Sequence, residues 1–536
     1  MRFFFITISC FLILITNNKC ATRGTPSGGE KDSIPPIMIR SIPKENSVFF
    51  DKEKIILNFN EYIKLKDLSN QLVISPPLNK SNYEIKPKLS ASKKVEIKFL
   101  KPLIENTTYT FNFGKSINDF NEGNLLPFFS YAFSTGADLD SLSFNGIVKD
   151  AIEMNPEESI SIHLYPIDST YNDSTIYFEK PLYVSNTIDS INFKFQNLKE
   201  GKYELIAIKD EGANYFFDQN TDKIGFLNSH VNIPLDSFAE ITLFKEITNF
   251  AWGTPKYVNT QLIEFPYYGN SSKKEILLKS KLSDDFNYVI TKNRKKDTLN
   301  FWYSNTKKFD SLIFNLKILD SIKTVTIKPK ETLIIDSLVI ESIQKTFMHL
   351  SDSIKIKTNL PITRINNDSI KIFDIDSLSI PFSIRIDPNL DQAYIKIKPL
   401  PNDLYTINIE SGAFIDFWEN SNKKTTFKLK TKAIEDYGII FLNINSKKSF
   451  PYFIEVLNSN NEIVRKVKKD SSYQNYSFKL LNPGKYTIRV IKDLNNNNQW
   501  DTGNYLEKKQ PEEVIYFPEE LDLRANWELY ETLSID

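Results

Sequence analysis

LKEGKYELIAIKD (residues 198–210) and LNPGKYTIRVIKD (residues 481–493) are two copies of one pattern in a chain of 536 residues. Each copy contains a Gly-Lys-Tyr step, apolar residues at alternate positions and a closing Asp. Alternation with a period of two is typical of a β-strand that has one buried and one solvated face. Phe195 and Phe478 precede the two copies at the same offset. We therefore expect one β-hairpin element that is used twice, with Gly at its turn.

A second, weaker repeat lies upstream of each copy. YTFNF (109–113) and INDF (117–120) parallel YTINI (405–409) and IDF (415–417), and an alternating strand follows both. A third segment, between the two sets, has no partner elsewhere in the chain. The repeats therefore predict the order A–B–C–A′–B′.

The repeats and the turn-rich stretches between them divide the chain. Strand-like alternation recurs at 95–99, 354–357, 394–398 and 427–430, and no long segment keeps a helical period. Many short strands separated by turn residues favour an all-β chain of tandem β-sandwiches. The predicted spans are 1–19 (leader), 20–32 (tether), 33–136 (A), 138–245 (B), 246–335 (C), 340–432 (A′) and 433–536 (B′).

Charge and composition exclude several classes of protein. The chain has 67 basic and 67 acidic residues, so it lacks the basic excess that nucleic-acid binding requires. Two Cys rule out a disulfide framework and a thiolate zinc cluster. Three well-separated His leave little material for a His-based metalloenzyme or a catalytic triad.

The first twenty residues have the pattern of an export signal. Met1–Arg2 is a basic start, Phe3–Ile15 is almost wholly apolar, and the run is too short to span a bilayer. Cys20 follows, and it resembles the lipidated first residue of a mature bacterial lipoprotein, although Lys19 stands where such proteins have a small residue. Acyl chains on Cys20 would anchor the chain in a membrane. The alternative is plain secretion with an incidental cysteine.

Three stretches carry family resemblances. IILNFNEYI (55–63) and LIENTTYTF (103–111) resemble the bacterial Ig-like domain named after the SbsA surface-layer protein. FNGIVKD (144–150) resembles the opening of transthyretin-like or carboxypeptidase-regulatory-like sandwiches, to which the B units are similar. The leader with RGTPSGGEKD (23–32) resembles Ig-like-domain lipoproteins of Bacteroidota, which implies a place in the cell envelope and no established activity.

The same resemblance implies a location. Surface-exposed lipoproteins of that group often carry an acidic cluster directly after the lipidated Cys, whereas here the first acid is Glu30. This favours the outer membrane with the chain on its periplasmic face. The expected partners are the membrane, through the lipid anchor, and an envelope protein or glycan.

The loop after the second copy is a candidate calcium site. Asp493, Asn495, Asn497 and Asp501 place oxygen side chains at loop positions 1, 3, 5 and 9, a spacing that wraps hard cations. Position 12 is Asn504 in place of the usual Glu. With two carboxylates we expect weak binding, in the roughly 0.1–1 mM class of extracellular modules. The alternative is an Asn-rich turn without metal.

Three functions are compatible with this organisation. The modular repeat, without a phosphate loop, nucleophile elbow or zinc-protease motif, favours a non-enzymatic, lipid-anchored scaffold or partner-binding protein. The aromatic content of 13%, with five Trp, could instead supply sugar-stacking platforms for a carbohydrate-binding lipoprotein, or simply fill cores. A hydrolase would need two facing carboxylates in a cleft. An extended row of five such domains would span well over 100 Å, on the order of 30–40 Å each.

Overall fold

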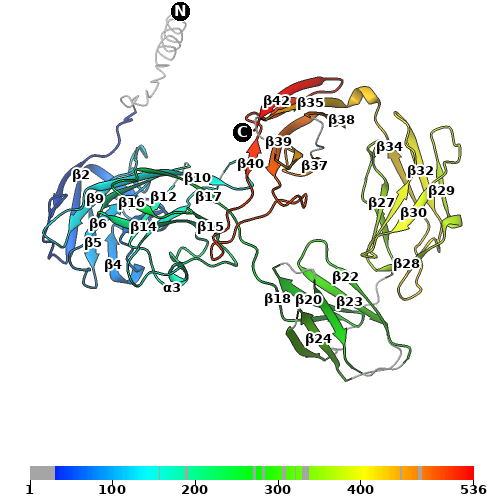
Figure 1. Cartoon of the computed structure of the whole chain (residues 1–536), viewed down its shortest axis with the longest axis horizontal. Coiled ribbons are helices and arrows are strands. Elements are labelled where there is room, and N and C mark those ends of the chain that lie inside the picture. The colour runs from blue at the N-terminus through cyan, green and yellow to red at the C-terminus, as the bar shows by residue number, and fades with distance from the viewer. Residues whose placement is uncertain are drawn as a thin grey trace, which may run out of the picture.

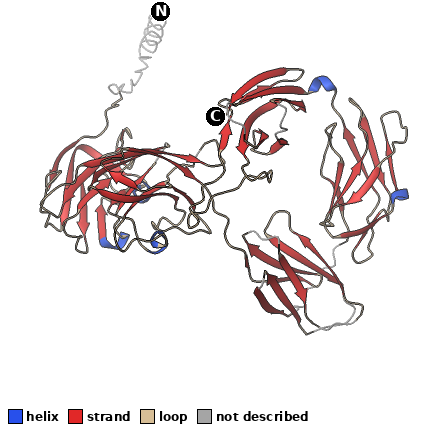
Figure 2. Ribbon diagram, in the orientation of Figure 1, coloured by secondary structure: helices blue, strands red, loops and turns tan. Residues whose placement is uncertain are grey.

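The computed structural model describes residues 31–535 except 156, 188–190, 270–272, 281–283, 305–309, 320, 329–336, 447–449 and 469–473. The leader, Cys20 and most of the tether lie outside the described residues. Strands dominate the described chain and helices are limited to short turns (Figure 2). The predicted all-β class of tandem sandwiches is therefore confirmed. Within the described part of the chain, no helix is long and apolar enough to cross a membrane.

Domain A is a sandwich of two antiparallel sheets. Its elements are β1 (Met38–Ile42), β2 (Lys54–Leu65), α2 (Leu68–Gln71), β3 (Val73–Ser75), the 3-10 helix η1 (Lys80–Asn82), β4 (Tyr83–Lys86), β5 (Ser92–Phe99), β6 (Thr108–Asn112), β7 (Ile117–Asp119), β8 (Leu125–Leu126) and β9 (Ser130–Ser134). One sheet has the order β4-β5-β2-β7-β8, with β1 also on β2, and the other has the order β3-β6-β9. The alternation at 95–99 places Val95, Ile97 and Phe99 in the core between them, as expected.

Domain B is a sandwich of a three-stranded and a five-stranded sheet. Its elements are β10 (Leu142–Asp150), β11 (Ser161–Pro166), α3 (Thr175–Phe178), β12 (Tyr183–Asn186), β13 (Asn192–Leu198), β14 (Gly201–Lys209), β15 (Lys223–Phe226), β16 (Val231–Ile233) and β17 (Phe238–Leu243). The smaller sheet is β13-β10-β17, in which β17 runs parallel to β10. The larger sheet is β12-β11-β14-β15, with β16 also on β14.

The predicted hairpin at the repeat is wrong. β13 and β14 flank the Gly turn, yet β13 pairs with β10 and β14 pairs with β11, β15 and β16. The turn therefore carries the chain from one sheet to the other. The physical reason is that both strands send apolar side chains into the same core, Phe193 and Phe195 from one layer and Leu205 and Ala207 from the other. Strands in facing layers fill a core together and cannot also pair edge to edge.

Domain C is a third sandwich. Its strands are β18 (Ala251–Trp252), β19 (Lys256–Asn259), β20 (Leu262–Tyr268), β21 (Lys274–Leu278), β22 (Asn287–Lys292), β23 (Thr298–Ser304), β24 (Leu312–Ile318) and β25 (Ser321–Ile327). One sheet is β18-β20-β23-β22 with β19 also on β20, and the other is β21-β24-β25. The strand-like runs at 298–303 and 311–314, from which C was inferred, lie at β23 and β24.

Domain A′ repeats the pairing of A. Its elements are β26 (Ile340–Ser342), β27 (Ile354–Thr358), β28 (Ile362–Ile365), η2 (Asn367–Ser369), β29 (Ile370–Phe373), β30 (Ser383–Ile386), β31 (Gln392–Lys396), β32 (Leu404–Ile409), β33 (Phe414–Asp416) and β34 (Thr425–Lys430). The sheet β29-β32-β34 corresponds to β3-β6-β9 of A. Asp119 in A and Asp416 in A′ are both buried, and each accepts backbone N–H groups of the loop that follows. The weaker repeat thus has a shared structural role in a capped turn.

Domain B′ repeats the topology of B strand for strand. Its elements are η3 (Ile434–Asp436), β35 (Gly438–Asn445), β36 (Tyr452–Asn458), β37 (Ile463–Lys468), β38 (Asn475–Leu481), β39 (Gly484–Lys492), β40 (Val514–Tyr516), β41 (Leu521–Leu523) and β42 (Glu528–Ser534). Its sheets are β38-β35-β42, with β42 parallel to β35, and β37-β36-β39-β40, with β41 also on β39. The internal repeat found in the sequence is one fold present twice.

Polar contacts join successive domains. Between C and A′, the guanidinium of Arg294 binds the carboxylates of Asp391 and Asp387 at 2.8 and 2.7 Å. Between A′ and B′, Nε2 of His349 donates to the carbonyl oxygen of Leu480 at 2.6 Å. Other contacts of this kind are Ser75–Val184 and Asn79–Lys180 between A and B, Tyr303–Trp418 between C and A′, and Lys432–Asn482 between A′ and B′.

The chain does not run out as an extended row. It turns from B through C and A′ and returns with B′ against B, so that these four domains form a ring (Figure 1). Domain A lies outside this ring beside B, at the end of the chain that carries the leader (Figure 1). The contact that closes the ring joins the two copies of the repeated sandwich.

Candidate functional site at the junction of B and B′

The five-stranded sheet of B is apolar on both faces, and the reason lies in β14. Leu205 and Ala207 point into the sandwich core, whereas Ile206 and Ile208 point outward into a second apolar cluster. An outward apolar face must be covered to leave water. The cluster that covers it contains Ala151, Tyr165, Ile176, Phe217, Ile224, Phe226 and Phe244 of B, together with Tyr505 of B′.

The cover from B′ comes from the long connection between β39 and β40, residues 493–513, which we call the arm. The arm leaves B′ and reaches the neighbourhood of β15 in B (Figure 1). It has two parts: the Asp/Asn loop at 493–501, and a docking segment at 502–510 that contacts B.

Tyr505 is the apolar centre of the contact. Its side chain is fully buried, and its ring meets the Phe226 ring edge-on with centroids 5.3 Å apart. Its hydroxyl lies 3.0 Å from the hydroxyl of Tyr171, and its backbone N–H donates to the buried carboxylate of Glu246. Burial raises the pKa of Tyr505, and the hydrogen bond to Tyr171 acts in the same direction, so the phenol stays protonated. A Cβ at Gly503 would lie 2.6 Å from the Phe244 ring, so Gly allows this close approach.

Lys508 adds charge pairs to the contact. Its Nζ lies 2.8 Å from a carboxylate oxygen of Asp173 and 3.5 Å from one of Glu204, and 3.9 Å from the ring centroid of Tyr505. Glu204 is buried, and its other oxygen is 2.6 Å from Nδ1 of His230. A buried carboxylate of B therefore has two partners, one of which B′ supplies.

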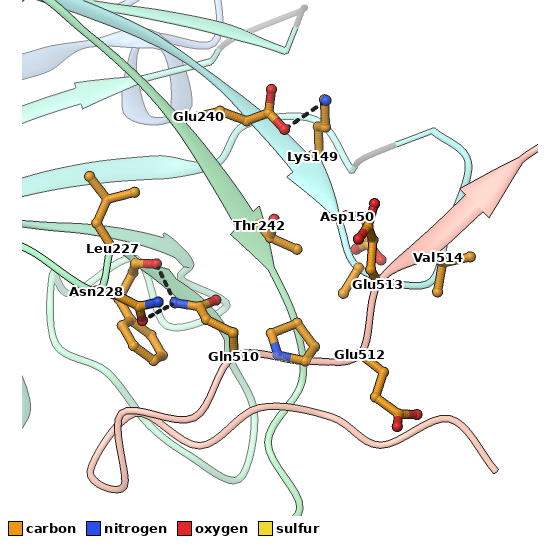
Figure 3. A pocket seen from close by; sticks show the side chains of 13 residues that line it. Lys149, Asp150, Leu227, Asn228, Glu240, Thr242, Gln510, Glu512, Glu513 and Val514 are labelled. Atoms are coloured by element: carbon orange, nitrogen blue, oxygen red, sulfur yellow. Dashed lines mark hydrogen bonds and ion pairs between the residues drawn. The ribbon is translucent and has the colours of Figure 1, made fainter. Parts of the chain in front are cut away.

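Neutral hydrogen bonds fix the two ends of the docking segment. Thr502 donates its hydroxyl to the carbonyl of Lys245 at 2.7 Å. Gln510 donates its side-chain N–H groups to the carbonyl of Phe226 at 2.9 Å and to Oδ1 of Asn228 at 3.2 Å (Figure 3).

A second contact between B and B′ centres on the carbonyl of Ile152. It accepts hydrogen bonds from Arg489 of β39, at 3.0 Å, and from the hydroxyl of Tyr516. Arg489 also forms an ion pair with Glu455 at 2.8 Å, and both side chains are almost wholly buried. Glu455 has a further partner in Lys466 at 2.9 Å. Arg489 stands in the repeat position of the outward-facing Ile206, so the two copies present unlike faces to each other.

A cleft of about 410 Å³ lies between B and the arm (Figure 3). Four carboxylates line it, and each is engaged by a neighbour. A hydrolase would need two of them free to face a substrate. The partners are Lys223 for Asp150 at 2.9 Å, Lys149 for Glu240 at 2.7 Å, Lys492 for Glu513 at 2.6 Å, and the backbone N–H groups of Leu494 and Asp501 for Glu512 at 3.0 and 3.1 Å.

The four residues of the predicted calcium site lie in the first part of the arm. Asn495 and Asn497 both donate their side-chain amides to the carboxylate of Asp501, the second at 3.1 Å. Asp493 is fully buried, and its carboxylate accepts the backbone N–H groups of Asn497 and Asn498 at 2.9 and 2.8 Å. Three of the four predicted side chains thus meet directly, while Asp493 holds the backbone of the loop.

The donor set of this loop is sparse. Among the described residues, no group of three or more His, Cys, Asp or Glu is placed to hold a metal ion. Glu512 lies close by, and partial burial together with the charges of Asp501 and Asp493 raises its pKa. The oxygens of Asn495, Asn497 and Asp501 fit a hard cation in kind, and calcium binding here stays a prediction.

That prediction gives a defined result. Adding 5 mM CaCl₂, about ten times the middle of the expected range, should raise the melting temperature of the wild type by a few degrees. EDTA should reverse the shift. The informative variant is Asp501→Asn, since Asp493→Ala would also free the backbone N–H groups that its carboxylate holds. An equal shift for Asp501→Asn and the wild type, or none for the wild type, would remove this loop as the site.

The three His occupy separate structural positions. His163 is fully buried in β11, where burial lowers its pKa to about 3 and keeps it neutral. His230 pairs with Glu204, and His349 binds Leu480 across the A′–B′ boundary.

The five Trp serve mainly as packing residues. Trp252 is buried in C, and Trp302 meets Trp418 edge-on at 6.0 Å between C and A′. Trp500 packs against the cluster that receives Tyr505, whereas Trp527 is about half exposed.

Sequence reasoning missed the docking segment. Tyr505, Lys508 and Gln510 stand in a turn-rich stretch without a motif. One signal was present in the receiving domain: residues 205–208 are LIAI without interruption, whereas their counterparts 488–491 are IRVI. An uninterrupted apolar run indicates a strand that is buried on both faces.

Comparison with known proteins places one of the five domains. Residues 32–135 match the model of a bacterial Ig-like domain, which confirms the resemblance proposed for A. No curated protein matches the chain.

Solved structures share strings of similar sandwiches with this chain. The Bacillus anthracis TIE protein is 10% identical, with a TM-score of 0.14, over 95% of this chain and 76% of that one. Domains 1–6 of the surface layer protein SbsC are 10% identical, with a TM-score of 0.17, over 91% and 67%. Immunoglobulin domains 1–5 of Sidekick-1 are 8% identical, with a TM-score of 0.13, over 94% and 100%. Likeness at this level carries no functional information.

Proposed function

We propose that the chain is a non-catalytic scaffold of a bacterial cell envelope, anchored to a membrane by lipid on Cys20. The bacterial Ig-like match of residues 32–135 and the export signal of the first twenty residues support an envelope protein. In this proposal A connects the anchor to the ring, and the ring of B, C, A′ and B′ presents a surface of fixed shape to a partner.

The docking of the arm on B carries this proposal. A scaffold needs its domains held at fixed angles, and inter-domain motion is the default where contacts between domains are small. Here the contact combines a buried aromatic ring, a shared buried carboxylate and hydrogen bonds at both ends of the docking segment. The carboxylates beside it are occupied by partners within the chain, which suits a structural role.

The finer placement is the periplasmic face of the outer membrane, with an envelope protein or a glycan as partner. Its basis is the sequence after Cys20, where the first acid is Glu30. On B′, Tyr530 is 69% exposed and stacks on Phe441 with ring centroids 4.7 Å apart, which makes this face a candidate for a sugar. Crosslinking in intact envelopes, followed by pull-down, tests the partner: recovery of one protein or one glycan with the wild type supports the proposal.

Replacing Cys20 by Ser tests the anchor. We expect the wild type in the membrane fraction, processed by the lipoprotein signal peptidase, and at least a tenfold shift of Cys20→Ser to the soluble fraction, since the acyl chains supply most of the membrane affinity. Cys10→Ser is the matched control, because it changes the other cysteine and leaves the anchor. A Cys20→Ser chain that stays in the membrane as the wild type does would end the anchor proposal.

A further inference from the structure

The contact that closes the ring joins two different surfaces. One is the docking segment 502–510 of B′. The other, which we call the receiving surface, is formed on B by Tyr171, Asp173, Glu204 and Phe226, with Glu246 at its edge. A contact between unlike patches can be made within one chain or between two chains, and exchange of an identical element between copies keeps every contact.

The docking segment is one continuous stretch, and its contacts travel with it. Thr502, Tyr505, Lys508 and Gln510 lie within nine residues, and they account for the hydrogen bonds, the ion pairs and the buried ring described above. Its support is its own domain: the apolar core of B′ is formed by other residues, from Ile440 to Ile535. Release from B would therefore leave B′ folded.

The two halves of the contact are joined only through C and A′ along the chain, residues 246–432 in the predicted division. Opening the contact separates B from B′ without breaking the chain, since C and A′ still connect them. An opened chain has one unoccupied receiving surface and one free docking segment.

We propose that the receiving surface of B is an exchangeable docking site whose second occupant is the arm of another copy of this chain. Two opened chains then form a dimer by exchanging arms, with each B receiving the Tyr505 of the other chain. Within one chain the effective concentration of the arm is on the order of mM, so the closed ring prevails in dilute wild-type protein.

A pair of complementary variants tests this exchange in the full chain. Tyr505→Ala removes the buried ring and leaves the receiving surface intact. Asp173→Arg with Asn228→Arg places two cations opposite Lys508 and Gln510 and leaves the docking segment intact; Asn228 is exposed and Asp173 is about half exposed, so B should still fold. Both are made in a Cys20→Ser background so that lipid does not drive association.

We expect each variant to be a monomer on its own, and the equimolar mixture to contain a 1:1 dimer of twice the mass by light scattering at about 100 µM, a concentration below the roughly mM value within one chain. Adding Tyr505→Ala to the second variant should abolish the dimer. If Tyr505→Ala fails to fold by circular dichroism, Lys508→Glu with Gln510→Ala replaces it. A mixture of folded variants that stays monomeric overturns the proposal, as does a dimer that survives when neither chain carries Tyr505.

Discussion

Replacing Tyr505 by Ala is expected to open the ring. Removing a fully buried aromatic side chain costs about 3 kcal/mol or more, because apolar contacts are lost and a cavity remains. Here that cost falls on the contact between B and B′, so the closed form should lose about a hundredfold in its equilibrium with the open form. Small-angle X-ray scattering should show a larger radius of gyration, and trypsin should cut the exposed arm faster.

Two matched variants identify the cause. Leu506→Ala changes the neighbouring residue, whose side chain is 57% exposed, and should behave as the wild type. Tyr505→Phe keeps the ring and removes the hydroxyl that faces Tyr171, so we expect a loss of about 1 kcal/mol and a ring that stays closed. An unchanged radius of gyration for Tyr505→Ala would mean that other contacts hold B′ on B.

Replacing Arg489 by Leu is expected to destabilise B′ by about 3 kcal/mol. The change leaves the carboxylate of Glu455 buried without its closest partner, and breaking a buried pair from one side costs about 3–5 kcal/mol. Lys466 remains beside Glu455, which places the expected loss at the low end of that range. The measurement is urea unfolding followed by the fluorescence of Trp500 and Trp527.

The repeat supplies the matched rescue. Glu455 and Arg489 are paired across β36 and β39, and the corresponding pair in B, across β11 and β14, is His163 and Ile206. Replacing both partners by apolar residues, Glu455→Leu with Arg489→Ile, should recover most of the lost stability, since no unpaired charge remains. A double variant that is less stable than Arg489→Leu would show that the pair contributes more than it costs.

The sequence predicted the sandwiches because their signal is local. Alternation at 95–99 or 354–357 reports one buried face of one strand, and that face is set by neighbours in the same domain. The repeat of 198–210 at 481–493 likewise predicted two copies of one fold, and the sheets of B and B′ have the same order.

The sequence did not predict how the copies meet. Tyr505 and Phe226 are about 280 residues apart in the chain, and nothing local to either residue reports the other. The hairpin at the Gly turn failed for a related reason, because alternation fixes which face of a strand is buried and not which strand lies beside it. The calcium loop was placed correctly as one loop, yet its donors are engaged with each other and with the backbone, which spacing cannot show.

The return of B′ to B is the central claim, and a distance measurement tests it most directly. Spin labels at exposed positions on B and B′, introduced by Lys194→Cys and Lys485→Cys with Cys10 and Cys20 replaced by Ser, report the separation of the two domains in solution. The closed ring predicts one narrow distance distribution, which broadens and lengthens when Tyr505→Ala is added. A broad, long distribution in the chain that retains Tyr505 would contradict a ring held closed by the arm.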